Sequence, residues 1–503
     1  MSKNYRNLAL CVVPALVALL GASSRAAAFP LVFSSDRQAE LVTCGCSIEQ
    51  LGGLSRVPAA LASKGVMPGK GGLWVDGGDL FFTSNGLSDD RLKKEKESAK
   101  FLAKIYKKWG VEVMTPGPKD FAGGMDFLRE VTKSAGIKLV SANLRTDKRQ
   151  ALFDPFTIVK RGDYRVAVIG ISGAALYSPT LGVTVSDPEA ALTEAFANAK
   201  KAGANFFVVL SQSGIEEDKL RAKKFPADVW ISGAASDSLP EPLKVGNTLV
   251  MQLMPQGQQL GVFHVESGQA IRFEPINVVH GLKEDKTIQR EVESLKKKQR
   301  AADAALPAGK GKPAYLADYE SCRRCHAEQV AFWETTDHAS AYLVLYSKNQ
   351  HFDRDCIGCH TLGFEKDPGF GKVAHPLVLK DKPSAGGEPF VETLMKKVFT
   401  RAGIPNGTDS ALSPREKRDE YAKVKRAYHD ELGELRKVNA LERNYLGVQC
   451  EHCHGNRTGH PWVKGAAKNK VSETTCRECH RAPNAPEFSP KMIPKVACPA
   501  MGS

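Results

Sequence analysis

The stretch "SCRRCHAEQVAFWETTDHASAY", residues 321 to 342, contains two cysteines, a histidine directly after the second one, and another histidine further on. The same C-x-x-C-H pattern recurs as "CIGCH" from residue 356, "CEHCH" from 450 and "CRECH" from 476. A pair of cysteines at this spacing also fits a Cys₄ zinc site or a thiol redox pair. Neither needs the fifth residue, yet histidine follows every pair and is only 12 of 503 residues.

The pattern predicts covalently attached haem c. Two thiols at this spacing can add to the two vinyl groups of one porphyrin, and the adjacent imidazole reaches its iron. We therefore expect four haems and no second metal. The predicted attachment residues are Cys322, Cys325, Cys356, Cys359, Cys450, Cys453, Cys476 and Cys479, and the predicted proximal iron ligands are His326, His360, His454 and His480.

Six more histidines in this region are candidates for the second axial position: His338, His351, His375, His429, His452 and His460. His452 lies inside its own motif, so we expect it at the surface. The stretch from 327 to 346 has helical composition without glycine or proline, and twelve residues of helix span about 18 Å. If that helix is continuous, His338 ligates a haem other than the one at His326 and brings two porphyrins together.

The segments "YESCRRCHAEQVAFWETTDHASAY", "CIGCHTLGF" and "VQCEHCHGNRTGH" resemble the tetrahaem cytochrome c family that accepts electrons from hydroxylamine oxidoreductase. The resemblance covers residues 313 to 483 and implies a mainly α-helical domain. It implies that His338 ligates the iron of His454, and that His460 ligates the iron of His480. For the second axial ligand of the first haem it leaves His429 or His375, with His351 as a further candidate. It does not settle whether the iron of the second haem is five-coordinate.

Residues 29 to 280 have a different pattern. Short apolar runs such as "RVAVIGIS" and "NFFVVLS" alternate with helical segments such as "DPEAALTEAFANAKKAG", which predicts a layered α/β sandwich. The blocks "LVFSSDRQAELVTCGC", "LWVDGGDLFF", "VEVMTPGPKDFAGG" and "VVLSQSG" resemble calcineurin-like metallophosphoesterases of the 5′-nucleotidase branch. Such enzymes hold two metal ions with aspartate and histidine ligands.

Most of the metal ligands that this resemblance implies are missing. Asp36 and Asp79 match family aspartates and Asp120 remains from G-N-H-D, whereas Lys119 stands where a ligand histidine is expected. Other matching positions hold Gln38, Pro118, Gln212, Ala234 and Ser236, and the first histidine of the chain is His264. We predict an inactive phosphoesterase-like domain in which Lys119 occupies the place of a lost metal, because the carboxylates of Asp36 and Asp79 repel one another.

Residues 1 to 28 read as a signal peptide, with basic residues before the apolar run "LALCVVPALVALLGA" and small residues near Ala28. Cleavage after Ala28 implies a periplasmic or otherwise exported protein without a membrane span. The alternative is that the apolar run is not cleaved and anchors the protein in the membrane. Residues 281 to 312 read as an exposed charged helix and linker, and residues 484 to 503 as an irregular tail. In an exported protein Cys44, Cys46 and Cys498 are candidates for a disulfide between the domains, a metal site or simple burial.

The formal net charge of +14 is spread over mixed charged segments. Because the basic runs lack interleaved aromatic residues, we expect no nucleic acid as a partner. The predicted haems instead imply redox proteins or small-molecule electron donors and acceptors as partners. The oligomeric state is left open. We expect an electron carrier. The alternatives are a multihaem reductase or oxidase with a five-coordinate haem, and an active phosphoesterase with a haem domain.

Overall fold

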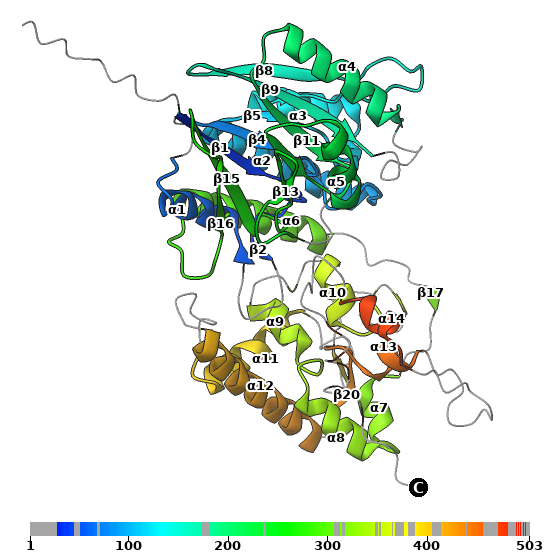
Figure 1. The fold of residues 1–503 in the computed structure, drawn as a ribbon. Helices are drawn as coiled ribbons and strands as arrows, with labels where there is room; N and C mark the ends of the chain where they lie inside the picture. The colour runs from blue at the N-terminus through cyan, green and yellow to red at the C-terminus, as the bar shows by residue number, and fades with distance from the viewer. Residues whose placement is uncertain are drawn as a thin grey trace, which may run out of the picture.

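The computed structural model describes residues 28–44, 51–67, 71–173, 182–234, 238–305, 312–313, 317–347, 351, 354–364, 366–367, 377–380, 388–404, 414–438, 440–455, 471–480 and five separate positions between 489 and 498. The N-terminal part of the chain forms two β-sheets with helices around them, and the C-terminal part is mainly helical (Figure 1). The predicted combination of a layered α/β domain and a helical domain is confirmed.

Two six-stranded sheets form the centre of the N-terminal domain. The first has the order β16 (Arg272–Asn277), β15 (Gln259–Glu266), β1 (Ala28–Ser34), β4 (Leu73–Asp76), β5 (Val111–Met114) and β6 (Lys138–Leu139). The second has the order β13 (Leu243–Val245), β14 (Thr248–Met251), β12 (Val229–Ser232), β11 (Phe206–Gln212), β9 (Tyr164–Ser172) and β8 (Phe156–Arg161). Short pairs join β2 (Thr43–Cys44) to β3 (Leu51–Gly52) and β7 (Leu144–Arg145) to β10 (Thr184–Val185).

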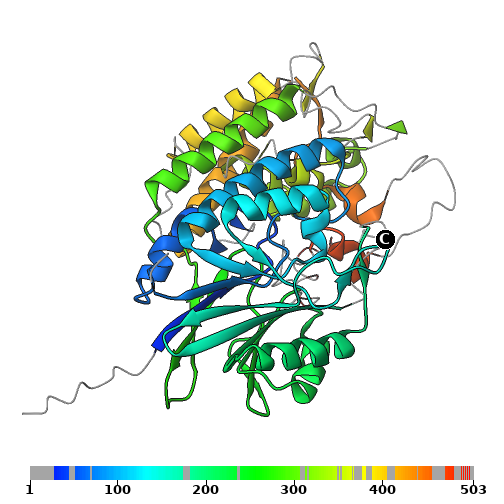
Figure 2. The same ribbon diagram turned by 90° about the horizontal axis from the view of Figure 1, so that it is seen from above.

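Side-chain alternation along the strands explains the layers. On β1, Leu31 and Phe33 pack in the cluster shared by the two sheets, whereas Val32 packs in the cluster beneath the helices, because successive side chains of a strand point to opposite faces. Helices α1 (Val57–Ala62), α2 (Asp89–Trp109) and α3 (Met125–Ala135) cover the first sheet, and α4 (Pro188–Lys201) and α5 (Ile215–Lys224) cover the second. Figure 2 shows the blue-to-cyan helices α2 and α3 on one side of the sheets and the darker green helices α4 and α5 on the other.

Helix α6 (Lys286–Ala305) corresponds to the segment that was expected to be an exposed charged helix. Its narrow apolar face is buried, since Ile288 and Val292 belong to the same hydrophobic cluster as α2. The Nε2 of Gln299 donates to the Ser98 hydroxyl at 3.0 Å, and Asp285 caps the N-terminus by accepting from the backbone N–H of Ile288. The helix therefore packs as part of the N-terminal domain, and only its other faces are solvated.

The C-terminal domain is built from short helices around the cysteine motifs and one long helical hairpin. The hairpin pairs α11 (Glu388–Arg401) with α12 (Pro414–Lys437), and their apolar faces share one cluster. The other elements are β17 (Lys312–Pro313), α7 (Tyr319–Arg323), α8 (Ala327–Thr335), α9 (Ala341–Ser347), α10 (Arg354–His360), β18 (Lys366–Asp367), β19 (Leu377–Leu379), β20 (Leu441–Asn444), α13 (Cys450–His454) and α14 (Glu473–Arg477).

The expectation of one continuous helix through His338 is wrong. Helix α8 ends at Thr335, residue Thr336 is extended, and α9 begins at Ala341. The ammonium of Lys425 donates to the carbonyl of Thr335 at 2.6 Å. The backbone N–H of Val448 donates to the carbonyl of His338 at 2.9 Å. Tertiary donors thus replace the helical hydrogen bonds at a Thr-Thr-Asp sequence of low helix propensity.

Residues 1 to 27 of the predicted signal peptide (1 to 28) and most of the predicted tail lie outside the described residues. Ala28, the last residue before the expected cleavage, begins β1. Among the helices of the described residues, none is long and apolar enough to span a bilayer.

The packing of α6 generates a prediction about stability. Replacing buried Ile288 with alanine should destabilise the N-terminal domain by about 2–5 kcal/mol, because it leaves a cavity between α6 and the sheet. The matched control is Lys298→Ala on the exposed face of the same helix, which should change stability by no more than about 0.5 kcal/mol. Calorimetric unfolding of the full chain measures both, and equal effects would show that α6 does not belong to this core.

Candidate haem sites and a degenerate metal site

Each cysteine motif forms a short helical turn. The backbone N–H of His326 donates to the carbonyl of Cys322 at 3.0 Å, and that of His480 to the carbonyl of Cys476 at 2.8 Å. The second motif lies within α10 and the third forms α13. Because residues three and four apart share one face of a helix, the two thiols and the imidazole of each motif lie together, as attachment to one porphyrin requires.

The four motifs converge in space in two contacts between cysteines. The Cys322 and Cys450 side chains pack against the same small hydrophobic cluster, and their interaction lowers the pKa of Cys322 and raises that of Cys450. The Cys359 thiol also lies close to that of Cys479 and raises its pKa. The first motif therefore lies against the third, and the second against the fourth.

A further cysteine lies beside the third motif. Burial raises the pKa of the Cys453 thiol, and the nearby thiols of Cys476 and Cys498 raise it further. Cys498 also raises the pKa of Cys450, after the larger effects of the Cys322 contact and burial. Of its predicted disulfide partners, the Cys44 side chain and Cys46 lie outside the described residues, so the clamp between the domains stays a prediction.

The histidines near the motifs are suited to bind iron. The Nδ1 of His360 lies 2.7 Å from the carbonyl oxygen of Ala341, an arrangement that fixes the ring and leaves Nε2 as the metal-binding nitrogen. Burial, followed by the charge of His480, lowers the pKa of His338 to about 4. Burial also lowers the pKa of His480. These imidazoles are neutral at neutral pH, which is the form that binds a metal.

The expectation that His452 is a surface residue is wrong. The ring is partly buried, its Nδ1 accepts from the backbone N–H of Gln449 at 3.0 Å, and its Nε2 lies 3.1 Å from the carbonyl oxygen of Thr361. Both nitrogens are engaged with the backbone, so His452 links the third motif to the residue that follows the second.

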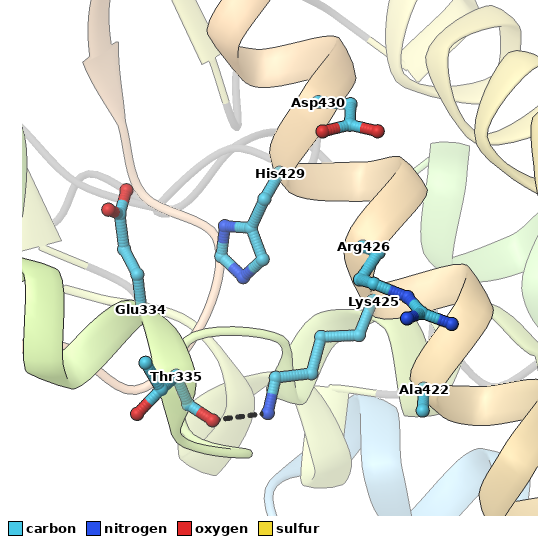
Figure 3. A pocket seen from close by; sticks show the side chains of 7 residues that line it. All are labelled: Glu334, Thr335, Ala422, Lys425, Arg426, His429 and Asp430. Carbon is cyan, nitrogen blue, oxygen red and sulfur yellow. Dashed lines mark hydrogen bonds between the residues drawn. The ribbon is translucent and has the colours of Figure 1, made fainter.

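His429 lies in a pocket between α8 and α12. Both of its ring nitrogens are buried without a hydrogen-bond partner, and burial lowers the pKa of the ring. Figure 3 shows the imidazole between Glu334 of α8 and Lys425 of α12. The lining residues are Glu334, Thr335, Ala422, Lys425, Arg426, His429 and Asp430. A buried imidazole without a partner is costly unless it binds something, and this fits a haem ligand.

The remaining predicted ligands are placed only in part. His326 caps the N-terminus of α8, and His454 ends α13. The ring of His351 lies 4.6 Å from that of Tyr346, measured between centroids. His375 and His460 lie outside the described residues.

The predicted remnants of the phosphoesterase site lie together at the carboxyl ends of neighbouring parallel strands. Asp36 follows β1, Asp76 ends β4 with Asp79 just after it, and Asp120 lies in the 3-10 turn η2 (Pro118–Phe121) after β5. All four side chains are almost fully buried. His264 pairs with Pro30 near the start of β1, at the other end of that strand.

Asp120 and Lys119 have separate roles around Asp79. The Asp120 carboxylate accepts from the backbone N–H groups of Asp79, Leu80, Phe81 and Gly117 and so joins two loops. The Lys119 ammonium lies 3.5 Å from the Asp79 carboxylate, which also accepts the Lys119 backbone N–H at 2.8 Å. Burial raises the pKa of Asp79 above its usual 3.8, and Lys119 opposes that rise. A cation therefore stands beside this carboxylate.

Sequence reasoning missed Arg37, a second cation at this site. It is 1% exposed, its Nε donates to the Tyr106 hydroxyl at 3.0 Å, and its charge opposes the burial that raises the pKa of Asp76 to about 6. Arg37 lies between Asp36 and Gln38, at the variable position of the D-x-H motif. A charged residue within this buried block was the sequence signal that could have identified it.

One of the other altered positions holds two loops together. The Nε2 of Gln212, which stands where a ligand histidine is expected, donates to the carbonyl of Gly77 at 2.6 Å. Ala234 adopts a positive φ of 57° after β12, and Ser236 lies outside the described residues. Within the part of the chain that the structure describes, no group of three or more His, Cys, Asp or Glu side chains could hold a metal ion.

Comparison with known proteins gives one family match. Residues 321–381 match the family described as cytochrome c554 and c-prime. The match begins at the first cysteine motif and includes the second. A search of curated proteins finds no match.

The solved structures similar to this chain include a nucleotidase, a thiohydrolase and a calcineurin-like phosphoesterase. A 5′-nucleotidase precursor from Thermus thermophilus is 21% identical over 57% of this chain and 62% of its own, with a TM-score of 0.46. The sulfate thiohydrolase SoxB of the same species is 18% identical over 63% of this chain and 67% of its own, with a TM-score of 0.45. The calcineurin-like phosphoesterase YfkN from Bacillus subtilis is 18% identical over 55% of this chain and 98% of its own, with a TM-score of 0.44.

The contact between Lys119 and Asp79 generates a pH-dependent prediction. Lys119→Met should lower the stability of the domain by about 1–3 kcal/mol at pH 7, because it leaves a buried carboxylate without its cation. The folded-state pKa of Asp79 already lies above the unfolded value of 3.8, and losing Lys119 raises it further. The loss should therefore be small near pH 4 and grow as the pH rises.

The matched control is Lys119→Arg, which keeps the positive charge and should retain most of the stability at every pH. Calorimetric unfolding between pH 4 and pH 8 distinguishes the two. A loss in Lys119→Met that does not depend on pH would contradict the role of the charge.

Proposed function

We propose that this chain is an exported tetrahaem c-type cytochrome that transfers electrons in the periplasm. The observation that carries the proposal is the convergence of all four C-x-x-C-H motifs, in which Cys322 lies against Cys450 and Cys359 against Cys479. Porphyrins attached at these cysteines would form two close pairs. When bound, each haem supplies an iron that takes up and releases one electron.

Hydrogen bonds fix the first and third motifs relative to one another. The N–H of Tyr319 donates to the Gln449 side chain at 2.9 Å, and the N–H of Asn444 donates to the carboxylate of Asp318 at 2.7 Å. Arg436 of α12 donates to the Tyr319 hydroxyl at 2.7 Å and to Glu320 at 2.7 Å. This buried network supports a fixed spacing between the haems, which electron transfer needs and which a flexible domain would not provide.

The supply of imidazoles favours a relay over a reductase. His338 and His429 are both partly buried, and neither ring nitrogen of His429 has a hydrogen-bond partner, whereas both of His452 are engaged with the backbone. A second imidazole on an iron closes the position at which a small molecule would bind. The hypothesis of a five-coordinate, small-molecule reductase stays the alternative.

The N-terminal domain would serve as a docking or ligand-binding unit without phosphoesterase activity. Lys119 and Arg37 supply the positive charge that metal ions supply in the enzymes. The relation to the electron acceptor of hydroxylamine oxidoreductase rests on the three quoted segments, and it points to an electron-donating enzyme as the partner.

The test of electron transfer is low-temperature electron paramagnetic resonance (EPR) on the oxidised protein, with haem counted on the same sample by the pyridine haemochrome method. We expect four haems per chain, all low-spin, that reduce reversibly in a potentiometric titration. A high-spin iron that binds carbon monoxide or nitrite would instead support the reductase.

Phosphoesterase activity has a separate test. Purified protein should release no phosphate from nucleotides in the presence of manganese, magnesium or zinc, because two-metal catalysis requires ligands that the domain lacks. Hydrolysis that is abolished by Asp79→Asn would contradict the proposed inactivity.

A further inference from the structure

The first motif is the most exposed of the four cysteine motifs. Among the eight motif cysteines, Cys325 is exposed, whereas the other seven are half-buried. Arg324, which lies between the two cysteines of the first motif, is exposed as well. A haem attached through Cys325 would therefore present an edge near the protein surface, where another protein can reach it.

Helix α12 places further cations close to the first motif. Glu334 of α8 forms an ion pair of 2.6 Å with Arg323 of that motif, and it lines the same pocket as Arg426 of α12. Figure 3 shows Glu334 and Arg426 on opposite sides of that pocket. Arg415 and Arg418 precede Arg426 by eleven and eight residues, and these spacings bring the three side chains near one face because a helix has 3.6 residues per turn.

Four exposed arginines form what we call the arginine surface: Arg324, Arg415, Arg418 and Arg426. Within the part of the chain that the structure describes, none of the four takes part in an ion pair. Two other arginines nearby, Arg323 and Arg436, are instead held by Glu320 and Glu334. These two hold α7, α8 and α12 together, whereas the arginine surface is available to carboxylates of another molecule.

The charges of this region favour an acidic protein as that molecule. Between residues 415 and 426 of α12, four exposed cations stand against two exposed acids, Glu416 and Asp419. A guanidinium binds a carboxylate through two parallel hydrogen bonds, so arginines suit the side chains of aspartate and glutamate. The two acids would repel a uniformly anionic membrane or nucleic acid, whereas a protein surface can match a mixed pattern of charge.

We propose that the arginine surface docks an acidic electron-transfer protein, which passes electrons to the first haem. This deepens the proposed function and rests on it. In each encounter the reduced partner loses one electron, and one ferric haem iron becomes ferrous. The arginines act mainly on the rate of association, since complementary charges steer two proteins together.

The test compares two donors by laser flash photolysis of the full haem-loaded chain. The probe is a flavodoxin semiquinone, carried by an acidic protein, and the reference is the lumiflavin semiquinone, which is small and neutral. For Arg418→Glu combined with Arg426→Glu, we expect the rate of haem reduction by flavodoxin, divided by the rate with lumiflavin, to fall about tenfold or more at low ionic strength. Damage to a haem would slow both donors, so it would not produce this change in the ratio.

The matched control is Lys200→Glu combined with Lys201→Glu, which changes the net charge by the same amount. Both lysines are exposed on α4, which lies far from α12 in Figure 1. Because charges far from the docking surface are screened by salt, the ratio should stay close to that of the unaltered protein. Arg418→Lys combined with Arg426→Lys keeps both charges and should retain most of the rate.

The unaltered protein provides a measurement that needs no variant. Its rate with flavodoxin should fall as the salt concentration rises, because ions screen the attraction. Our proposal is overturned if that rate does not depend on salt, if the double glutamate variant keeps the ratio, or if the control on α4 lowers the ratio equally.

A membrane surface is the other outcome that would overturn the proposal. In that case the unaltered protein would sediment with phosphatidylglycerol vesicles and the double glutamate variant would not, while the flavodoxin ratio stayed unchanged. Fewer than four haems, or haems that lumiflavin does not reduce, would contradict the proposed function instead, so the two failures are distinguishable.

Discussion

The C-terminal domain depends on the contact between cysteine motifs that are far apart in the sequence. Cys322 and Cys450 are separated in the chain by helices α8 to α12, yet both side chains pack against the same small hydrophobic cluster. Buried polar groups hold this arrangement: Asp318, Tyr319 and Gln449 satisfy backbone donors and one another across the two motifs. Because such groups are costly to bury without partners, the network specifies one relative position of the motifs.

Four buried carboxylates lie together in the N-terminal domain, and their charge is balanced by groups of the protein itself. Asp36, Asp76, Asp79 and Asp120 lie at one edge of the first sheet, where metal ions would balance their charge in an enzyme. Here the balance comes from Lys119 and Arg37, from backbone N–H groups on Asp120, and from raised pKa values that favour protonation. The lysine beside Asp79 is therefore one of several groups that balance these carboxylates.

Local sequence patterns identified the four cysteine motifs and the alternation of apolar runs with helical segments in the N-terminal domain, because each depends on residues close together in the chain. Three features could not be predicted, because each depends on a partner far away in the chain. The helix break at Thr336 depends on Val448 and Lys425. The burial of α6 depends on α2, and the role of His452 depends on Thr361. Arg37 was missed for the same reason, since its partner Tyr106 lies 69 residues away.

We propose that each of the four converging motifs carries one haem. The most direct test is the intact mass of the purified protein after denaturation, which retains covalently bound groups. Our account predicts one species that has lost the first 28 residues and gained the mass of four haems, with all eight motif cysteines unavailable to thiol reagents. A chain with free motif cysteines, or with zinc released on denaturation, would contradict it.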